Sequence, residues 1–312
     1  MKSYLSFTLT GGRLFPVWII FYLFFIIPFY FLLDEFAILT DSVVPAGGPS
    51  KLFFLYLAIV ISMAFIFTFY LSKLLLESIV YKNHKLVCVY DKPKYTWIII
   101  SGTILSLVTL GIYIPWFIRN IHEYFIGGAS YKSDKFSFKG KGSNLFWTIT
   151  LTFIFLFFFT GLFLFSILKS EDLRIYQVII TVCFFLNLSL VLKWMINFSY
   201  KSYLIKCTPE LFPLAGKIAL EIILGVVTFG IYFPLAYLRL YSYFVEHTKS
   251  NVVNGMQISM GYDGELISSF FFIWGQIILT AFTLGLYYPW AYCKIMQRVL
   301  NHTFLESDVM AL

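Results

Sequence analysis

The sequence predicts a polytopic α-helical membrane protein with short β-strands between its membrane segments. Of its 312 residues, 60% are hydrophobic and 12% are charged, whereas soluble domains carry about 25% charged residues. The mean hydropathy is +0.83, and the apolar residues form runs near the length needed to cross a bilayer core of about 30 Å. Three of these runs end in one repeated pattern, Thr-x-Gly-x-Tyr-x-Pro.

The repeated pattern predicts breaks or turns in membrane helices. Glycine loosens a helical backbone, and proline removes an N–H donor and clashes with the preceding turn. Inside a bilayer the freed backbone groups need partners in protein or in a water-lined cavity. The predicted structural positions are Thr109, Gly111, Tyr113 and Pro115; Thr228, Gly230, Tyr232 and Pro234; and Thr283, Gly285, Tyr287 and Pro289.

A second repeat predicts short strands. Five segments alternate for a few residues and then carry Gly or Pro turn residues before an apolar run. They are residues 4–15, 86–95, 136–146, 203–212 and 256–266. Because an isolated strand is unstable and an open sheet edge cannot lie in lipid, we expect these strands to pair outside the bilayer on one face.

The membrane segments between the strands are of two types. Hairpins of two full spans are expected at 15–33 with 52–76 and at 145–168 with 175–192, and single motif runs at 95–115, 211–234 and 266–289. The units are therefore 1–85, 86–135, 136–202, 203–255 and 256–312, all within one integral membrane domain.

The charge distribution favours four full spans and three broken or re-entrant motif segments over the alternative of seven spans. With four spans and a cytoplasmic N-terminus, all 23 basic residues except Lys51, Lys169 and Arg174 lie inside, as the positive-inside rule expects. Seven spans divide them almost equally. A motif run of 18 residues nevertheless measures about 27 Å, nearly enough to cross alone.

These motifs resemble those of the YjgN-like bacterial inner-membrane proteins. The similarity rests on the strand and turn at residues 136–146 and on the T-L-G-x-Y-x-P-W stretches at 109–116 and 283–290, and it extends from about Leu86 onward. The chain departs from the family pattern at Leu235, where Trp is expected. The family has no known function, so the resemblance implies a multi-pass protein of the bacterial inner membrane and no activity.

Lys217 and Glu221 are the strongest candidate functional pair. They lie four residues apart on one helix face in an apolar stretch, and ionisable residues in membrane segments are functional candidates by default. They could line an aqueous path. Alternatively, Lys217 reaches the interface and Glu221 is its satisfied partner.

Cations and histidines that follow the motifs form two further candidate sets. Arg119, Arg239 and Lys294 lie four or five residues after the motif prolines and could bind lipid phosphate or an anionic solute, or simply fix orientation. His247 and His302 each lie 13 residues after a motif proline. They could ligate metal or sense pH, but a polar helix end explains them as well.

The composition and motifs exclude several function classes. The net charge of +7 fits positive loops rather than nucleic-acid binding, and the four separated cysteines predict neither disulfides nor a zinc site. We expect no enzyme, metal or cofactor, and membrane lipid as partner. The favoured function is a transport or channel-like protein. The alternatives are a scaffold or lipid-binding subunit of an envelope complex, with a homo-oligomer possible, and, as a minor case, a lipid-modifying enzyme.

Overall fold

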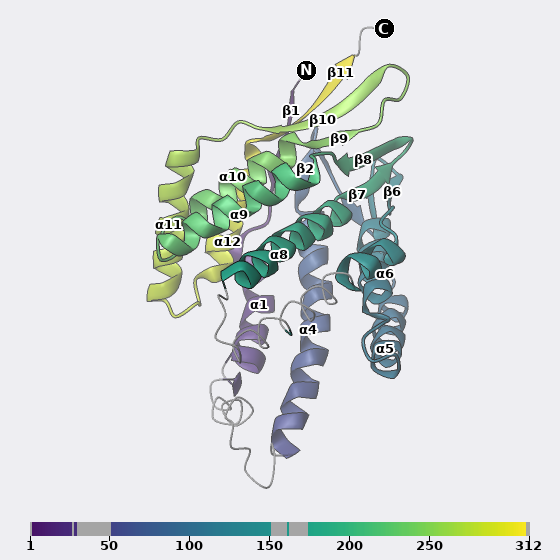
Figure 1. The fold of residues 1–312 in the computed structure, drawn as a ribbon, viewed down its shortest axis with the longest axis vertical. Coiled ribbons are helices and arrows are strands. Elements are labelled where there is room, and N and C mark those ends of the chain that lie inside the picture. The colour runs from purple at the N-terminus through teal and green to yellow at the C-terminus, as the bar shows by residue number, and fades with distance from the viewer. Residues whose placement is uncertain (1, 27, 30–50, 151–160, 162–173, 310–312) are drawn as a thin grey trace.

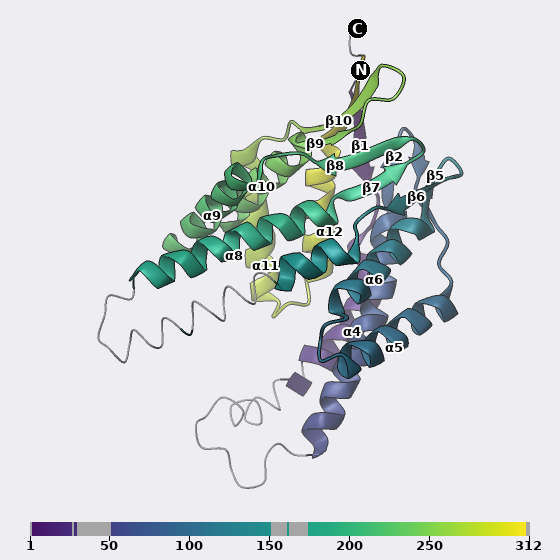
Figure 2. The ribbon, with the colours of Figure 1, turned by 45° about the vertical axis from the view of Figure 1, so that its right-hand side comes forward.

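The computed structural model describes residues 2–26, 28–29, 51–150, 161 and 174–309. Its strands gather at one end of the molecule, and its helices extend away from them (Figures 1 and 2). Much of the predicted span at 145–168, and the end of the one at 15–33, lies outside the described residues.

Each of the five repeat units leaves the sheet on one strand and returns to it on another. The outgoing strands are β1 (Ser3–Phe7), β4 (Val87–Cys88), β6 (Asp134–Phe138), β8 (Tyr203–Cys207) and β10 (Met256–Tyr262). The returning strands are β2 (Ile79–Tyr81), β5 (Ala129–Tyr131), β7 (Asn197–Tyr200), β9 (Thr248–Ser250) and β11 (Thr303–Val309). Within every unit the two strands pair antiparallel. A strand therefore lies in each of the five segments identified from the sequence, and the returning strands are additional.

The sheet joins the two ends of the chain. Its order is β3-β2-β1-β11-β10-β9-β8-β7-β6-β5-β4, with β3 at His84–Lys85. The pairing of β1 with β11 brings the first and last units together, as the neighbouring termini in Figure 1 show. Neighbouring strands are joined by tight turns at Lys82-Asn83, between β2 and β3, and at Lys132-Ser133, between β5 and β6. Their positive φ values match the hairpin turns that follow strand twist.

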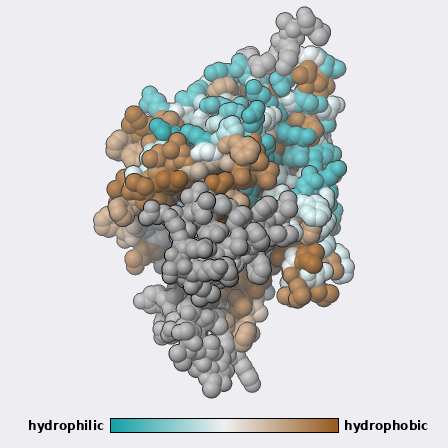
Figure 3. Space-filling model, in the orientation of Figure 1, coloured by the Kyte–Doolittle hydropathy of each residue, from teal (hydrophilic) through white to brown (hydrophobic). Residues whose placement is uncertain are grey.

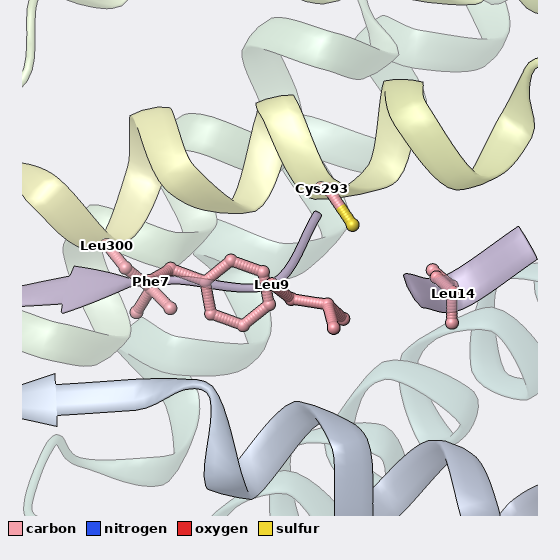
Figure 4. Close-up of a cluster of buried hydrophobic side chains, with 5 residues drawn as sticks. All are labelled: Phe7, Leu9, Leu14, Cys293 and Leu300. Carbon is pink, nitrogen blue, oxygen red and sulfur yellow. The ribbon is translucent and has the colours of Figure 1, made fainter. Parts of the chain in front are cut away.

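A buried residue at the end of each outgoing strand fastens the sheet to the helices. It is the third residue before the N-cap of the following helix, and it is at most 9% exposed in every unit. These residues are Phe7, Cys88, Phe138, Cys207 and Tyr262. In the first unit, Phe7 and Leu9 pack with Cys293 and Leu300 of the last helix (Figure 4), so the core also joins the chain ends.

The helices pack mainly on their neighbours in the chain. They are α1 (Gly11–Phe21), continued by a π-helical turn (Tyr22–Ile26), α4 (Lys51–Glu77), α5 (Lys92–Val108), α6 (Ile114–Gly128), α8 (Arg174–Met195), α9 (Leu211–Val227), α10 (Phe233–Glu246), α11 (Leu266–Phe282) and α12 (Tyr288–Asn301). Residues 142–150 are also helical. The pairs α5–α6, α9–α10 and α11–α12 form the three motif hairpins, and α12 packs on α1.

The predicted fold class is wrong. The sequence predicts four full spans with three re-entrant segments, or alternatively seven spans. Among the described residues, one helix is long and apolar enough to cross a membrane, at Phe53–Glu77. An eleven-stranded antiparallel sheet organises the protein instead. Hydropathy misleads here because an apolar run does not show how long a continuous helix is: α5, α9 and α11 have 17 residues each, fewer than the roughly 20 that a span needs.

The packing of the first unit on the last predicts that Leu9 is critical for stability. Leu9 is fully buried between β1 and α12, so Leu9→Ala should lower the free energy of unfolding by about 2–5 kcal/mol. Val89→Ala is the control, since Val89 is 75% exposed. Denaturation of both variants in mild detergent checks this, and equal stabilities would contradict the role given to Leu9.

Candidate functional site

Each Thr-x-Gly-x-Tyr-x-Pro motif forms the turn of an antiparallel helical hairpin. The threonine caps the first helix: its hydroxyl donates to the carbonyl four residues earlier and accepts the N–H of the motif tyrosine at 3.0–3.1 Å. The proline stands at the start of the second helix, where its missing N–H costs nothing. The threonine and proline thus end one helix and begin the next.

The motif glycine makes the reversal possible. Gly111, Gly230 and Gly285 have φ near +90°, a backbone angle that residues with a side chain rarely adopt. The N–H of each donates to the carbonyl five residues earlier at 2.7–2.8 Å, as in a Schellman cap. The residue before each glycine is also left-handed. The motif is therefore a turn device repeated three times.

The motif tyrosine connects the two helices of its hairpin through a polar contact that we call the tyrosine cluster. In the second motif unit, Tyr232 donates to Oε2 of Glu221 at 2.7 Å and accepts from Arg239 at 2.9 Å. In the third, Tyr287 donates to Gln276 at 3.0 Å and accepts from Lys294 at 2.9 Å. The partners lie 11 residues before and 7 residues after the tyrosine in both units.

The first motif unit keeps only part of this cluster. Asn120, seven residues after Tyr113, donates to its hydroxyl at 3.4 Å. The position 11 residues before is Gly102, where a side chain would collide with the ring of Phe117. The first hairpin therefore replaces the polar partner with aromatic packing.

Glu221 is the centre of the most strongly charged cluster. Its side chain is fully buried, and Lys217 approaches Oε1 at 2.6 Å while Arg239 lies 4.0 Å away. Burying a carboxylate is costly unless charge and hydrogen bonds compensate it, and Lys217, Tyr232 and Arg239 supply both. The structure therefore brings the predicted pair together and adds the motif tyrosine and Arg239 to it.

The three predicted cations do not form one equivalent set. Arg239 and Lys294 occupy the same place, but the corresponding residue in the first unit is Asn120. Arg119 turns instead to Glu123 at 2.6 Å. The spacing from the motif tyrosine, rather than from the proline, is the signal in the sequence. Asn120 lies seven residues after Tyr113, and Gln276 lies 11 residues before Tyr287.

The two predicted histidines lie apart in separate contacts. His247 approaches the carbonyl of Tyr243 at 2.8 Å, and His302 lies 3.5 Å from Asp263. Tyr4 donates to Asp263 at 2.6 Å, and this hydrogen bond, aided by His302, lowers the pKa of the Asp263 carboxyl. Among the described residues, no three His, Cys, Asp or Glu side chains are grouped to hold a metal.

Comparisons with known proteins support the resemblance suggested by the motifs. Residues 2–121 match a family model described as "Bacterial protein of unknown function (DUF898)". The chain is 33% identical over 72 residues to "Inner membrane protein YjgN" of Salmonella typhimurium (strain LT2), a stretch that covers 23% of this chain and 18% of that protein. The similarity to the YjgN-like family is thus confirmed, and it includes the part before Leu86. No solved structure matches the chain.

The repeats provide a matched test of the charge on Glu221. Glu221→Ala should destabilise the protein by about 3–5 kcal/mol, because it leaves Lys217 without its buried partner. Gln276→Ala, at the equivalent place in the third unit, should cost only about 1–3 kcal/mol, because no ion pair is lost. Denaturant unfolding in detergent measures both. Similar losses would show that the ion pair contributes little.

Proposed function

We propose that this YjgN-like protein is held in the bacterial inner membrane by the apolar ends of its helical hairpins, and acts there as a non-enzymatic lipid-binding or scaffold protein. The observation that carries the proposal is the residue before each motif glycine. Leu110, Phe229 and Leu284 are 94%, 96% and 79% exposed, although all three are large and apolar.

The backbone at these residues makes water an unsuitable surrounding. Each has φ of 50–52°, a left-handed conformation that costs a side-chain-bearing residue roughly 1–2 kcal/mol and that Gly, Asn or Asp tolerates better. A turn facing water would gain from a polar residue here. In lipid, a leucine or phenylalanine gains enough from its apolar surroundings to offset the strain.

The wider surface supports the same environment. Figure 3 shows hydrophilic residues over the strands and hydrophobic residues over α9, α11 and the far end of α5. The long helix α4 also exposes apolar side chains, among them Phe54 and Leu55 at 57% and 58%. Contiguous exposed apolar surface of this kind marks a membrane or partner interface.

The length of the hairpin helices limits how deeply they could reach into the bilayer. The 17 residues of α5, α9 and α11 span about 25 Å each, less than the hydrocarbon core of about 30 Å. Both ends of every hairpin return to the sheet, so the turn end of each hairpin would meet the lipid and the sheet side would face water. We place that side in the cytoplasm, because basic residues concentrate on cytoplasmic segments.

Spin labels can test the immersion of the hairpin ends. In a protein with its four native cysteines replaced, nitroxide labels at Leu110→Cys, Phe229→Cys and Leu284→Cys should collide more with oxygen, which concentrates in lipid, than with a water-soluble nickel chelate. A label at Ser133→Cys, in the turn between β5 and β6, should show the opposite preference. Chelate access at the three hairpin ends equal to that at Ser133 would refute the proposal.

A transport or channel-like role is the second candidate, and the buried Glu221 favours it. Ionisable groups inside membrane segments commonly mark ion or proton paths, and Lys217 and Arg239 retain exposed fractions of 29% and 43% beside Glu221. Against it, the carboxylate is already satisfied within its own hairpin.

Reconstituted liposomes separate the two roles. For a lipid-binding or scaffold protein, proton, potassium and chloride permeability should equal that of empty liposomes. A flux in the native protein that Glu221→Gln abolishes, and that Gln276→Ala leaves intact, would favour transport instead. A scaffold role would also require a second copy of the chain or a partner from an envelope complex. Pull-down in mild detergent should then recover that partner with the protein.

A further inference from the structure

An apolar groove runs between α4 and α5, which lie side by side in Figure 2. Its volume is about 600 Å³, and aliphatic and aromatic side chains form most of its walls. Phe65 and Ile100 stand in the middle, and Ile61 and Ile104 stand at the end away from the sheet. The hydroxyl of Tyr95 donates to the carbonyl of Phe65 at 2.9 Å and holds the helices together.

The groove has the length of one leaflet. The α5 wall extends from Lys92 to Ile104, which at 1.5 Å per residue is about 18 Å. Half of a bilayer core is about 15 Å. The sheet-side end is at Lys92, and the far end approaches the exposed hairpin turn at Leu110.

Lys92 is the charged residue that lines this groove. Within the part of the chain that the structure describes, it forms no ion pair, and its ammonium lies 5.8 Å from the ring centre of Tyr70. It is the first residue of α5, directly after the N-cap Asp91, and its side chain is exposed at the sheet-side end of the groove. Nearby Trp97 is 69% exposed, as aromatic side chains at the headgroup level often are.

A second apolar cavity adjoins the groove. It lies between α1 and α4, has a volume of about 220 Å³, and is lined by residues such as Ile20 and Phe24. Ile66 and Tyr70 of α4 line both spaces and form a ridge between them. Two apolar channels that meet near one cation match the two acyl chains and the phosphate of a single lipid.

We propose that the α4–α5 groove is a specific site for one anionic phospholipid. One acyl chain occupies the groove, the second occupies the α1–α4 cavity, and the phosphate pairs with Lys92. This inference rests on the proposed membrane attachment and adds to it a defined site and a headgroup charge. Lipids that merely surround the protein would show no fixed number, and a general attraction of anionic lipid to this basic protein would not depend on Lys92 more than on another lysine.

Lipid retention tests the site. The full-length protein would be reconstituted in nanodiscs of phosphatidylglycerol and phosphatidylethanolamine in equal amounts, transferred to mild detergent, and examined by native mass spectrometry. The native protein should retain one phosphatidylglycerol in preference to phosphatidylethanolamine. Lys92→Gln should reduce this preference roughly fivefold, which corresponds to about 1 kcal/mol for one lysine acting on an anionic headgroup.

The chain offers a matched control and a second variant. Lys94→Gln removes the same charge two residues away, from an exposed side chain that does not line the groove, and should leave the preference unchanged. Thr103→Phe places a ring inside the groove and should reduce retention of both lipids. Thermal unfolding of each variant would confirm that it is folded.

Two outcomes overturn the inference. One is retention of the two lipids in their bilayer proportions by the native protein, and the other is an equal effect of Lys92→Gln and Lys94→Gln. Either result leaves the membrane attachment intact if the spin labels at the hairpin ends report lipid. If those labels report water, the proposed function fails whatever the lipid preference is.

Discussion

The helical segment of every repeat unit begins after one strand and ends before another strand of the same sheet, and most of the structure follows from that constraint. A strand needs hydrogen-bonded neighbours along its edges, and here the outgoing strand of each unit obtains one from its own returning strand. The helices between them must therefore reverse direction at their far end. In three units the Thr-x-Gly-x-Tyr-x-Pro turn performs that reversal with almost the same dihedral angles and hydrogen bonds.

A hairpin that projects far from its sheet also needs contacts along its length, and the motif tyrosine supplies them. In the second and third motif units its hydroxyl bonds to one position on each helix, which keeps the two helices in register. The partner on the first helix is a carboxylate in one unit and an amide in another, Glu221 and Gln276. The geometry thus tolerates different charges. For this reason we interpret the tyrosine cluster first as a contact that holds the two helices together, and only second as part of an ion or proton path.

The sequence allowed the turns and the outgoing strands to be located, because Gly, Pro and alternating residues act locally. It did not reveal returning strands such as Ala129–Tyr131 and Thr248–Ser250, which are three residues long and follow a helix directly. One partner of each lies far along the chain, at Val87–Cys88 and at Tyr203–Cys207. The number of spans was wrong for another reason: hydropathy does not show whether an apolar run forms one continuous helix that is long enough to cross a bilayer. Of the candidate site, Lys217 and Glu221 could be paired from their spacing, whereas the link to Tyr232 required the fold of the hairpin.

The first motif hairpin differs from the other two at the residue that faces its tyrosine on the first helix. Where the other two carry Glu221 or Gln276, it has Gly102, and the ring of Phe117 occupies the vacated space. Phe117 in turn lies 6.0 Å, centre to centre, from Phe65 of α4, and Phe65 lines the α4–α5 groove. Loss of the polar partner therefore lets α6 support an apolar wall rather than a charged cluster. The same hairpin design serves as a charge-stabilised clamp in the second and third motif units, and as one side of the proposed lipid site in the first.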